Sequence, residues 1–309
     1  MISPMNPVIR GLPWLLALLL TPAAGLAEPL RVFASVAPIQ SFIAAVGGSH
    51  VDARAMVRPG FDPHTYDPTP QQISALAEAV LYVRTGVPFE QVWMKRIRSA
   101  NPRMEVIDAR DGIALRRPEA HDDEQDGHDE HEEAHGHEEA GAHDHAGEWD
   151  PHVWVSPRLA RHMAGVIRDA LTALAPAHAA DFARNYDAFA TELDALDREL
   201  RVLLDPLPHR KFMVFHPAWG YFADQYGLIQ VPIEREGKGP GARGLAELIG
   251  QAKRDGIKTV FVQPQFDKRK AAQVARAIDG GVISVDPLHA DYINNLRRVG
   301  REFARALRP

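Results

Sequence analysis

The chain has 309 residues, 45% of them hydrophobic and 25% charged, which is typical of a globular protein of about two domains. It contains no cysteine, so thiolate metal sites, cysteine nucleophiles, disulfides and a lipid-modified cysteine are excluded. Its net charge of −6 comes from residues 119–149, which hold 13 Asp or Glu and no Lys or Arg; the rest is mildly basic without Lys/Arg clusters, so nucleic acid is not an expected partner.

Residues 1–27 have the pattern of a secretory signal peptide. Arg10 is the only charged residue in this range, an apolar run occupies 12–20, and the small residues of 25–27 fit a cleavage site near Ala27. The apolar run is too short to span a bilayer, and the alternative is an uncleaved anchor. We therefore expect an exported protein that is free in a periplasm, since no cysteine is present for lipid attachment.

Residues 28–155 alternate between strand and helix patterns. The strand patterns predict a parallel α/β lobe, because helical patterns separate them in sequence. Thr69 followed by Pro70 is a predicted helix start, with Thr69 as the N-cap. The predicted strands are 30–37, 51–57, 80–86 and 104–109, and the predicted helices are 38–48, 69–79 and 88–100.

Residues 117–149 interrupt this alternation. Their low hydrophobicity and high charge predict a disordered loop rich in histidine and acidic residues. Neutral imidazoles bind metal ions in competition with protons, so these histidines are predicted to form several weak metal sites. They are His121, His128, His131, His135, His137, His143 and His145.

A helical region at 156–207 precedes a second α/β lobe at 208–309. The helical pattern of 178–207 is long for one domain and is predicted to join the two lobes as a backbone helix. The overall fold prediction is two parallel-sheet α/β lobes with a cleft between them. In the second lobe the predicted strands are 211–215, 228–233, 258–263 and 282–285, and the predicted helices are 217–226, 243–255, 267–278 and 289–307.

Four polar residues lie where they can meet in that cleft. His64, His216 and Asp286 follow predicted strands, and His152 precedes a helix in a second Asp-Pro-His sequence. Ligands of parallel sheets bind at the carboxyl ends of strands, so we expect these side chains to converge. Three imidazoles and a carboxylate suit tetrahedral Zn²⁺ better than Mg²⁺ or Ca²⁺. A single histidine after a strand is more often capped or solvated, and the spacing alone leaves both interpretations open.

Other residues near the predicted ligands receive simpler interpretations. Glu234 follows a strand and is either a partner of a ligand or a solvated carboxylate. Three aromatic residues beside the ligands are expected to pack and line the cleft: Trp154, Trp219 and Tyr66. Five further histidines have no matching context and are expected to be ordinary surface residues: His50, His162, His178, His209 and His289.

Four sequence motifs carry a resemblance to a known family. They are DPHTYDPTP at 62–70, DPHVWVSP at 150–157, VFHPAWGYFADQYGL at 214–228 and VDPL at 285–288. In this order they resemble the cluster A-I solute-binding proteins of ABC importers, the receptors for zinc and manganese. The likeness extends over essentially the whole chain after the signal.

The resemblance implies two α/β lobes bridged by a long helix, with one metal ion in the cleft. His64, His152 and His216 match the three histidine ligand positions, and Asp286 matches a position that supplies a carboxylate in many members. Manganese-preferring members tend to have Glu at the position of His216, and zinc members often carry a His-rich loop before the second ligand. Relatives often have Glu at the position of Gln263.

The sequence therefore predicts a monomeric, non-catalytic periplasmic receptor that delivers Zn²⁺ to the membrane permease of an ABC importer. The alternatives are a receptor for manganese or another divalent metal, an exported zinc hydrolase, a metal-linked adhesin, or a zinc buffer. Against the hydrolase, no Glu is placed beside a predicted ligand as a general base. The His-rich loop is expected to capture, buffer or sense zinc.

Overall fold

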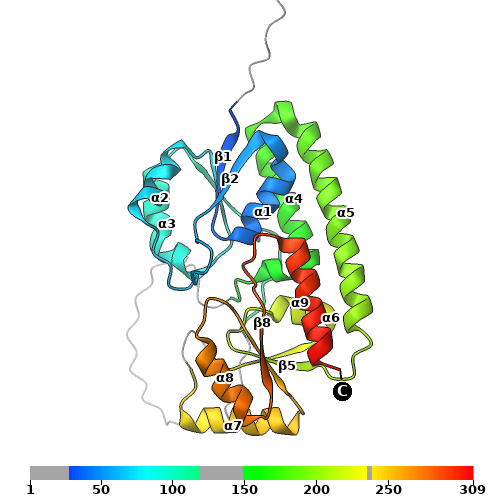
Figure 1. Ribbon diagram of the computed structural model, residues 1–309. Coiled ribbons are helices and arrows are strands. Elements are labelled where there is room, and N and C mark those ends of the chain that lie inside the picture. Colours follow the sequence, from blue (N-terminus) through cyan, green and yellow to red (C-terminus); the bar gives the residue numbers. More distant parts are fainter. Residues whose placement is uncertain (1–27, 119–148, 235–238, 309) are drawn as a thin grey trace, which may run out of the picture.

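Two parallel four-stranded sheets form the framework of the protein (Figure 1). The computed structural model describes residues 28–118, 149–234 and 239–308; the predicted signal peptide and the seven histidines of the predicted loop lie outside these residues. The first sheet has the order β2-β1-β3-β4 and the second the order β6-β5-β7-β8. The strands are β1 Leu30–Ala34, β2 Val51–Ala55, β3 Leu81–Arg84, β4 Glu105–Asp108, β5 Lys211–Val214, β6 Ile229–Pro232, β7 Thr259–Val262 and β8 Gly281–Ser284.

Every strand pairing is parallel, which confirms the prediction of two α/β lobes. The two lobes share the same strand order although their sequences are dissimilar. The carboxyl ends of the strands in both sheets lead into the loops that carry the predicted ligands. The helices that connect and cover the strands are α1 Ala37–Gly47, α2 Pro70–Ala75, α3 Pro88–Ala100, α6 Gly220–Tyr226, α7 Ala242–Arg254, α8 Lys268–Ala277 and α9 Tyr292–Ala306.

The start of α2 follows local sequence chemistry. Thr69 Oγ1 accepts a hydrogen bond from the backbone N–H of Gln72, and Gln72 Oε1 accepts one from the N–H of Thr69, with Pro70 at the first helical position. This capping box satisfies N–H groups that have no partner inside the helix. The prediction of Thr69 as N-cap is confirmed.

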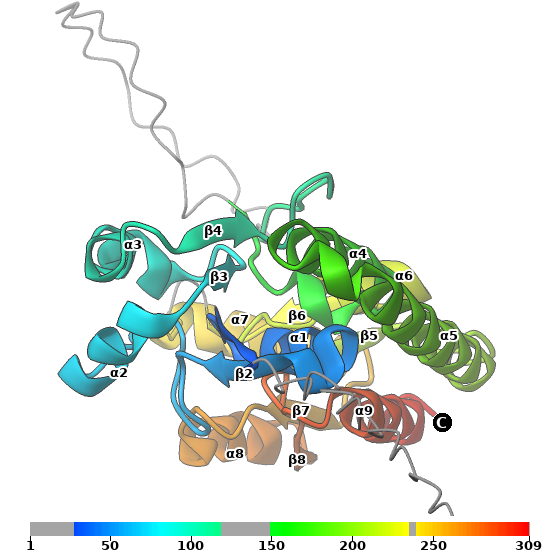
Figure 2. The same cartoon turned by 90° about the horizontal axis from the view of Figure 1, so that it is seen from above.

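Two long helices, α4 (Pro157–Leu174) and α5 (Ala179–Leu204), run beside the lobes. The 26 residues of α5 correspond to a length of about 39 Å. This helix packs on α1 and α4 at the first lobe and on α6 and α9 at the second, so it runs along both (Figures 1 and 2). The predicted backbone helix is present. No helix in the described part of the chain is long and apolar enough to cross a bilayer.

One hydrophobic core continues from the first lobe into the second. It includes Phe42 of α1, Phe189 of α5 and Phe303 of α9, all with little or no exposure. Tyr292 of α9 packs edge-on against Phe42, with 4.8 Å between the ring centroids. A smaller core lies in the second lobe around Met213, with residues of α7 and α8. The large apolar contact makes the lobes one packed unit.

Phe303 is predicted to be a main contributor to stability. Its ring is fully buried and contacts Phe212 and Phe261 at centroid distances of 4.6 and 4.5 Å. Replacing a buried Phe by Ala removes these contacts and leaves a cavity, so F303A should lower the free energy of unfolding by about 3–5 kcal/mol. Val202→Ala is the matched control, because Val202 is 76% exposed. Equal urea midpoints for the two variants would contradict this prediction.

Candidate metal centre

His64 lies in the loop between β2 and α2. The backbone N–H of His64 donates to Asp62 Oδ1 at 2.9 Å, which closes an Asx turn around Pro63. Its Nε2 atom is buried and has no hydrogen-bond partner among the described residues. A buried polar atom without a partner is costly, so this nitrogen is placed to bind a water molecule or an ion.

His152 lies in a second Asp-Pro-His turn, directly before the short 3₁₀ helix Val153–Val155. Asp150 Oδ1 accepts from both the backbone N–H (3.0 Å) and the ring Nδ1 (2.8 Å) of His152. Arg116 Nη1 donates to the other carboxylate oxygen of Asp150 at 3.0 Å. The ring is thereby fixed with Nε2 left for a ligand.

The carboxyl group of Asp150 is fully buried yet held ionised. Burial raises the pKa of Asp150, but the hydrogen bonds from His152 and the positive charge of Arg116 oppose this effect, and its pKa lies below the ordinary value. Asp150 is therefore an acceptor for the Nδ1–H of His152, and this sets the tautomer of the ring.

His216 follows β5 and is oriented by three side chains. Its Nδ1 donates to Glu234 Oε1 at 2.7 Å, and its ring stacks on Phe266 with 4.7 Å between centroids. Gln263 Nε2 donates to the carbonyl oxygen of His216 at 2.7 Å. Of the two interpretations of Glu234, the solvated carboxylate is wrong, because Glu234 is buried and is the partner of the predicted ligand His216. Gln263 therefore holds the backbone of His216 in place.

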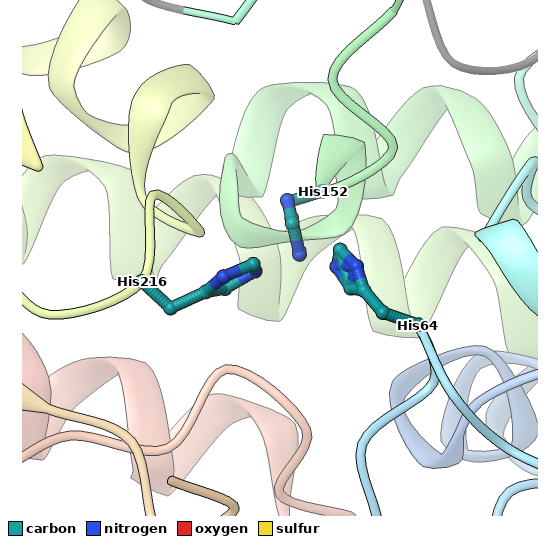
Figure 3. A group of neighbouring side chains, drawn as sticks. All are labelled: His64, His152 and His216. Carbon is teal, nitrogen blue, oxygen red and sulfur yellow. The ribbon is translucent and has the colours of Figure 1, made fainter. Parts of the chain in front are cut away.

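The three imidazoles meet in one place (Figure 3). The ring centroid of His64 lies 4.6 Å from the ring centroid of His216 and 5.6 Å from that of His152. One donor nitrogen from each ring lies within 4.8 Å of the other two. His152 and His216 are buried, and His64 is half-buried. The cavity that they line has a volume of about 10 Å³, enough for one water-sized occupant.

Burial favours the neutral form of the His64 and His216 rings. Burial lowers the pKa of His64, and the neighbouring His216 lowers it further. Burial also lowers the pKa of His216, although the hydrogen bond to Glu234 opposes the shift. Only neutral imidazole has a lone pair for a metal ion, so these environments keep the donors available.

Asp286 does not join the three histidines. Its Oδ1 atom accepts from the backbone N–H of Leu288 at 2.9 Å and from Gln265 Nε2 at 3.0 Å. Asp286 lines a neighbouring cavity, and Gln265 lies on the wall of both cavities. The assignment of Asp286 as the fourth ligand stays a prediction.

The aromatic residues behave as packing residues, as predicted. Trp154 and Trp219 are fully buried and Tyr66 is 4% exposed. The supporting residues Asp150, Arg116 and Phe266 were missed from the sequence. The repeated Asp-Pro-His pattern was the available signal for Asp150, because the Asp of such a turn accepts from the residue two positions later.

The chain matches a family model over most of its length. The model of the family described as zinc-uptake complex component A, periplasmic (ZnuA) matches residues 32–306. The high-affinity zinc uptake system protein ZnuA of Yersinia pestis is 25% identical over 313 residues, covering 96% of this chain and 98% of that protein. The zinc-binding lipoprotein AdcA of Streptococcus pneumoniae (strain TIGR4) is 27% identical over 264 residues, covering 84% of this chain but 50% of AdcA.

Solved structures agree with this match. A crystal structure of ZnuA has a TM-score of 0.79 and 37% identity, covering 90% of this chain and 99% of that chain. The crystal structure of a ZnuA deletion mutant (138-173) with zinc bound has a TM-score of 0.80 and 36% identity, and the match covers 91% of this chain and 99% of that chain. The chain belongs to the ZnuA family of periplasmic zinc-uptake components.

Proposed function

We propose that the protein is the zinc receptor of an ABC importer, which binds one Zn²⁺ ion between its lobes and delivers it to the membrane permease. The observation that carries this proposal is the meeting of His64, His152 and His216 around a cavity of single-ion size. Membership of the ZnuA family and the zinc named for its relatives support it.

The ligand chemistry favours zinc over manganese. Three imidazoles are donors that suit Zn²⁺, whereas Mn²⁺ is better served by carboxylates and water. For a given set of nitrogen donors, Zn²⁺ also binds more tightly than Mn²⁺ in the Irving–Williams order. Buried carboxylates beyond two of the rings, Asp150 and Glu234, offset part of the charge of the ion. Asp286 or water completes the coordination.

The site suits binding rather than catalysis. A zinc hydrolase needs a carboxylate or similar base beside the metal-bound water. Asp150 and Glu234 are instead each engaged by the Nδ1–H of a ligand histidine. The cavity that the three histidines line is of single-ion size. We propose no enzymatic activity.

The cellular location and the protein partner follow from the same proposal. The chain is exported, its signal is cleaved near Ala27, and the mature protein acts as a monomer in the periplasm, with the permease as its protein partner. The 119–148 segment supplies additional weak zinc sites that collect or buffer the ion. Relatives named periplasmic or lipoprotein support an extracytoplasmic location.

Loss of a metal-ligating histidine should lower the affinity for zinc. Replacing His64, His152 or His216 by Ala removes an inner donor and should weaken the tight site by at least about 100-fold, given that loss of an outer partner alone costs 10–100-fold. Asp286→Ala should cost less, because water can take that position. His209→Ala is the control, because His209 is exposed and outside the histidine group. Competition titration with a zinc chelator measures each affinity, and three wild-type affinities would rule out this constellation.

Acid should release zinc in two steps. Unperturbed imidazoles titrate near pH 6.5, so the loop ions should leave first as pH falls. Burial lowers the pKa of His64 and His216, so protons displace the cleft ion at a lower pH, below about 6. Equilibrium dialysis from pH 8 to 4 should show the first step only in the chain that retains residues 119–148. A single step in the full chain would contradict this division.

The delivery role is tested in cells. A strain lacking the gene should grow poorly when a chelator limits zinc, and the wild-type gene should restore growth and zinc accumulation. His216→Ala should not restore them, since the variant lacks a donor, while His209→Ala should. Growth equal to wild type in the deletion strain, with zinc uptake unchanged, would refute the proposal.

A further inference from the structure

A second group of metal-binding side chains lies at the outer end of the first lobe. His50 ends the 3₁₀ turn Gly48–His50 directly before β2, and His178 ends the 3₁₀ turn Pro176–His178 directly before α5. Asp181 lies in the first turn of α5. His50 precedes the amino end of β2, whereas His64 follows its carboxyl end, so the two histidine groups lie at opposite ends of the strand.

The three side chains are in mutual reach. One donor atom from each lies within 4.8 Å of the other two. The rings of His50 and His178 stack with 3.9 Å between centroids and an interplanar angle of 19°. His50 Nε2 lies 2.8 Å from Asp181 Oδ2. Two imidazoles and a carboxylate from two separate segments therefore share one small region of the surface.

The scaffold beneath this group is fixed by packing. Phe182 is fully buried and meets both rings edge-on, at 5.8 Å from His50 and 6.2 Å from His178. Asn185 Nδ2 donates to the carbonyl oxygen of Val46 at 3.1 Å and so ties the last turn of α1 to α5. Folding alone brings the two histidine-bearing turns together.

We propose that His50, His178 and Asp181 form a second binding site for a divalent transition-metal ion, Zn²⁺ in the first instance, separate from the cleft. Donor atoms about 2.1 Å from a tetrahedral ion lie about 3.4 Å apart. The present donors lie within 4.8 Å of one another, and His50 Nε2 and Asp181 Oδ2 are 2.8 Å apart, so small side-chain movements suffice. The ion takes the position of the proton between His50 Nε2 and Asp181 Oδ2, and the rings tilt until both lone pairs point at it. Water fills the remaining coordination positions.

The electrostatics place this site below the cleft in affinity. Hydrogen bonds from Arg184 and then His50 hold the pKa of Asp181 below its ordinary value, so the carboxylate is ionised at neutral pH. Arg184 Nη2, at 2.6 Å from Asp181 Oδ1, also adds a competing positive charge. The side chains of His50 and Asp181 are 25% and 38% exposed, so water screens the site and competes for the ion.

Residue-specific modification tests the proposal in the full chain. The cleft is first loaded with one equivalent of Zn²⁺, and free zinc is then raised in buffered steps at pH 7.5. Diethyl pyrocarbonate labels unliganded imidazoles, and peptide mass spectrometry follows His50, His178 and the exposed control His209 separately. Labelling of His50 and His178 should slow by at least about 5-fold with one common zinc midpoint, because a metal-bound nitrogen is not nucleophilic. Labelling of His209 should not change.

Two variants distinguish coordination from a change in packing. H178A should abolish the zinc protection of His50, and Asp181→Asn should shift the midpoint to zinc concentrations about 10-fold higher, as expected for a weakened ligand set. Both variants should still bind one equivalent of Zn²⁺ tightly in the cleft. That result shows that the chain is folded, and it separates this proposal from the proposal of the zinc receptor. Two results would overturn the second site. One is a labelling rate of His50 and His178 that does not change up to millimolar zinc, and the other is zinc protection of His50 that persists in H178A.

Discussion

The position of the second lobe against the first is the constraint on which the metal centre depends. Tyr292 of α9 donates from its hydroxyl to the carbonyl oxygen of Trp154 at 2.6 Å, and Trp154 Nε1 donates to the carbonyl oxygen of Pro287 at 2.8 Å. Trp154 is two residues from His152, and Pro287 follows Asp286. These bonds run through a fully packed apolar contact, so the loops that bear the site are fixed across the lobe boundary.

The packed boundary between the lobes brings the three imidazoles together. Placing neutral rings side by side in a buried site costs little electrostatically, whereas three protonated rings would repel one another and lose hydration. Carboxylates then orient two of the rings from the side away from the cavity: Asp150 for His152 and Glu234 for His216. The free energy of binding is therefore not spent on ordering these two side chains.

Much of the architecture was predictable because it depends on local patterns. The alternating strand and helix patterns predict both sheets and the long helix, and Thr69 predicts the start of α2. The three histidines were predictable because they follow strands or turns whose direction is set by the sheets. Glu234 remained open in the sequence, since its partnership with His216 depends on how two neighbouring strand ends align.

Asp286 shows the limit of such reasoning. In Asp62-Pro63-His64 and in the turn at 150–152, the Asp accepts from the N–H two residues later, and the third residue bears the imidazole. Asp286 occupies the first position of the same kind of turn, with Leu288 at the third, and its carboxylate accepts from that N–H in the same way. The sequence shows a carboxylate after the strand at this position. The backbone N–H of Leu288 that competes for its oxygen depends on the turn, which only the structure shows.

The two histidine groups use the same donor chemistry with different surroundings. In the cleft, Nδ1 of His152 and of His216 donates to a buried carboxylate, which fixes the tautomer of both rings, and burial lowers the pKa of His216. At the outer group, the single carboxylate is both the ligand and the partner of Arg184, and solvent reaches the side chains. Since preorganisation and exclusion of water set the strength of a metal site more than donor identity does, affinity should follow burial.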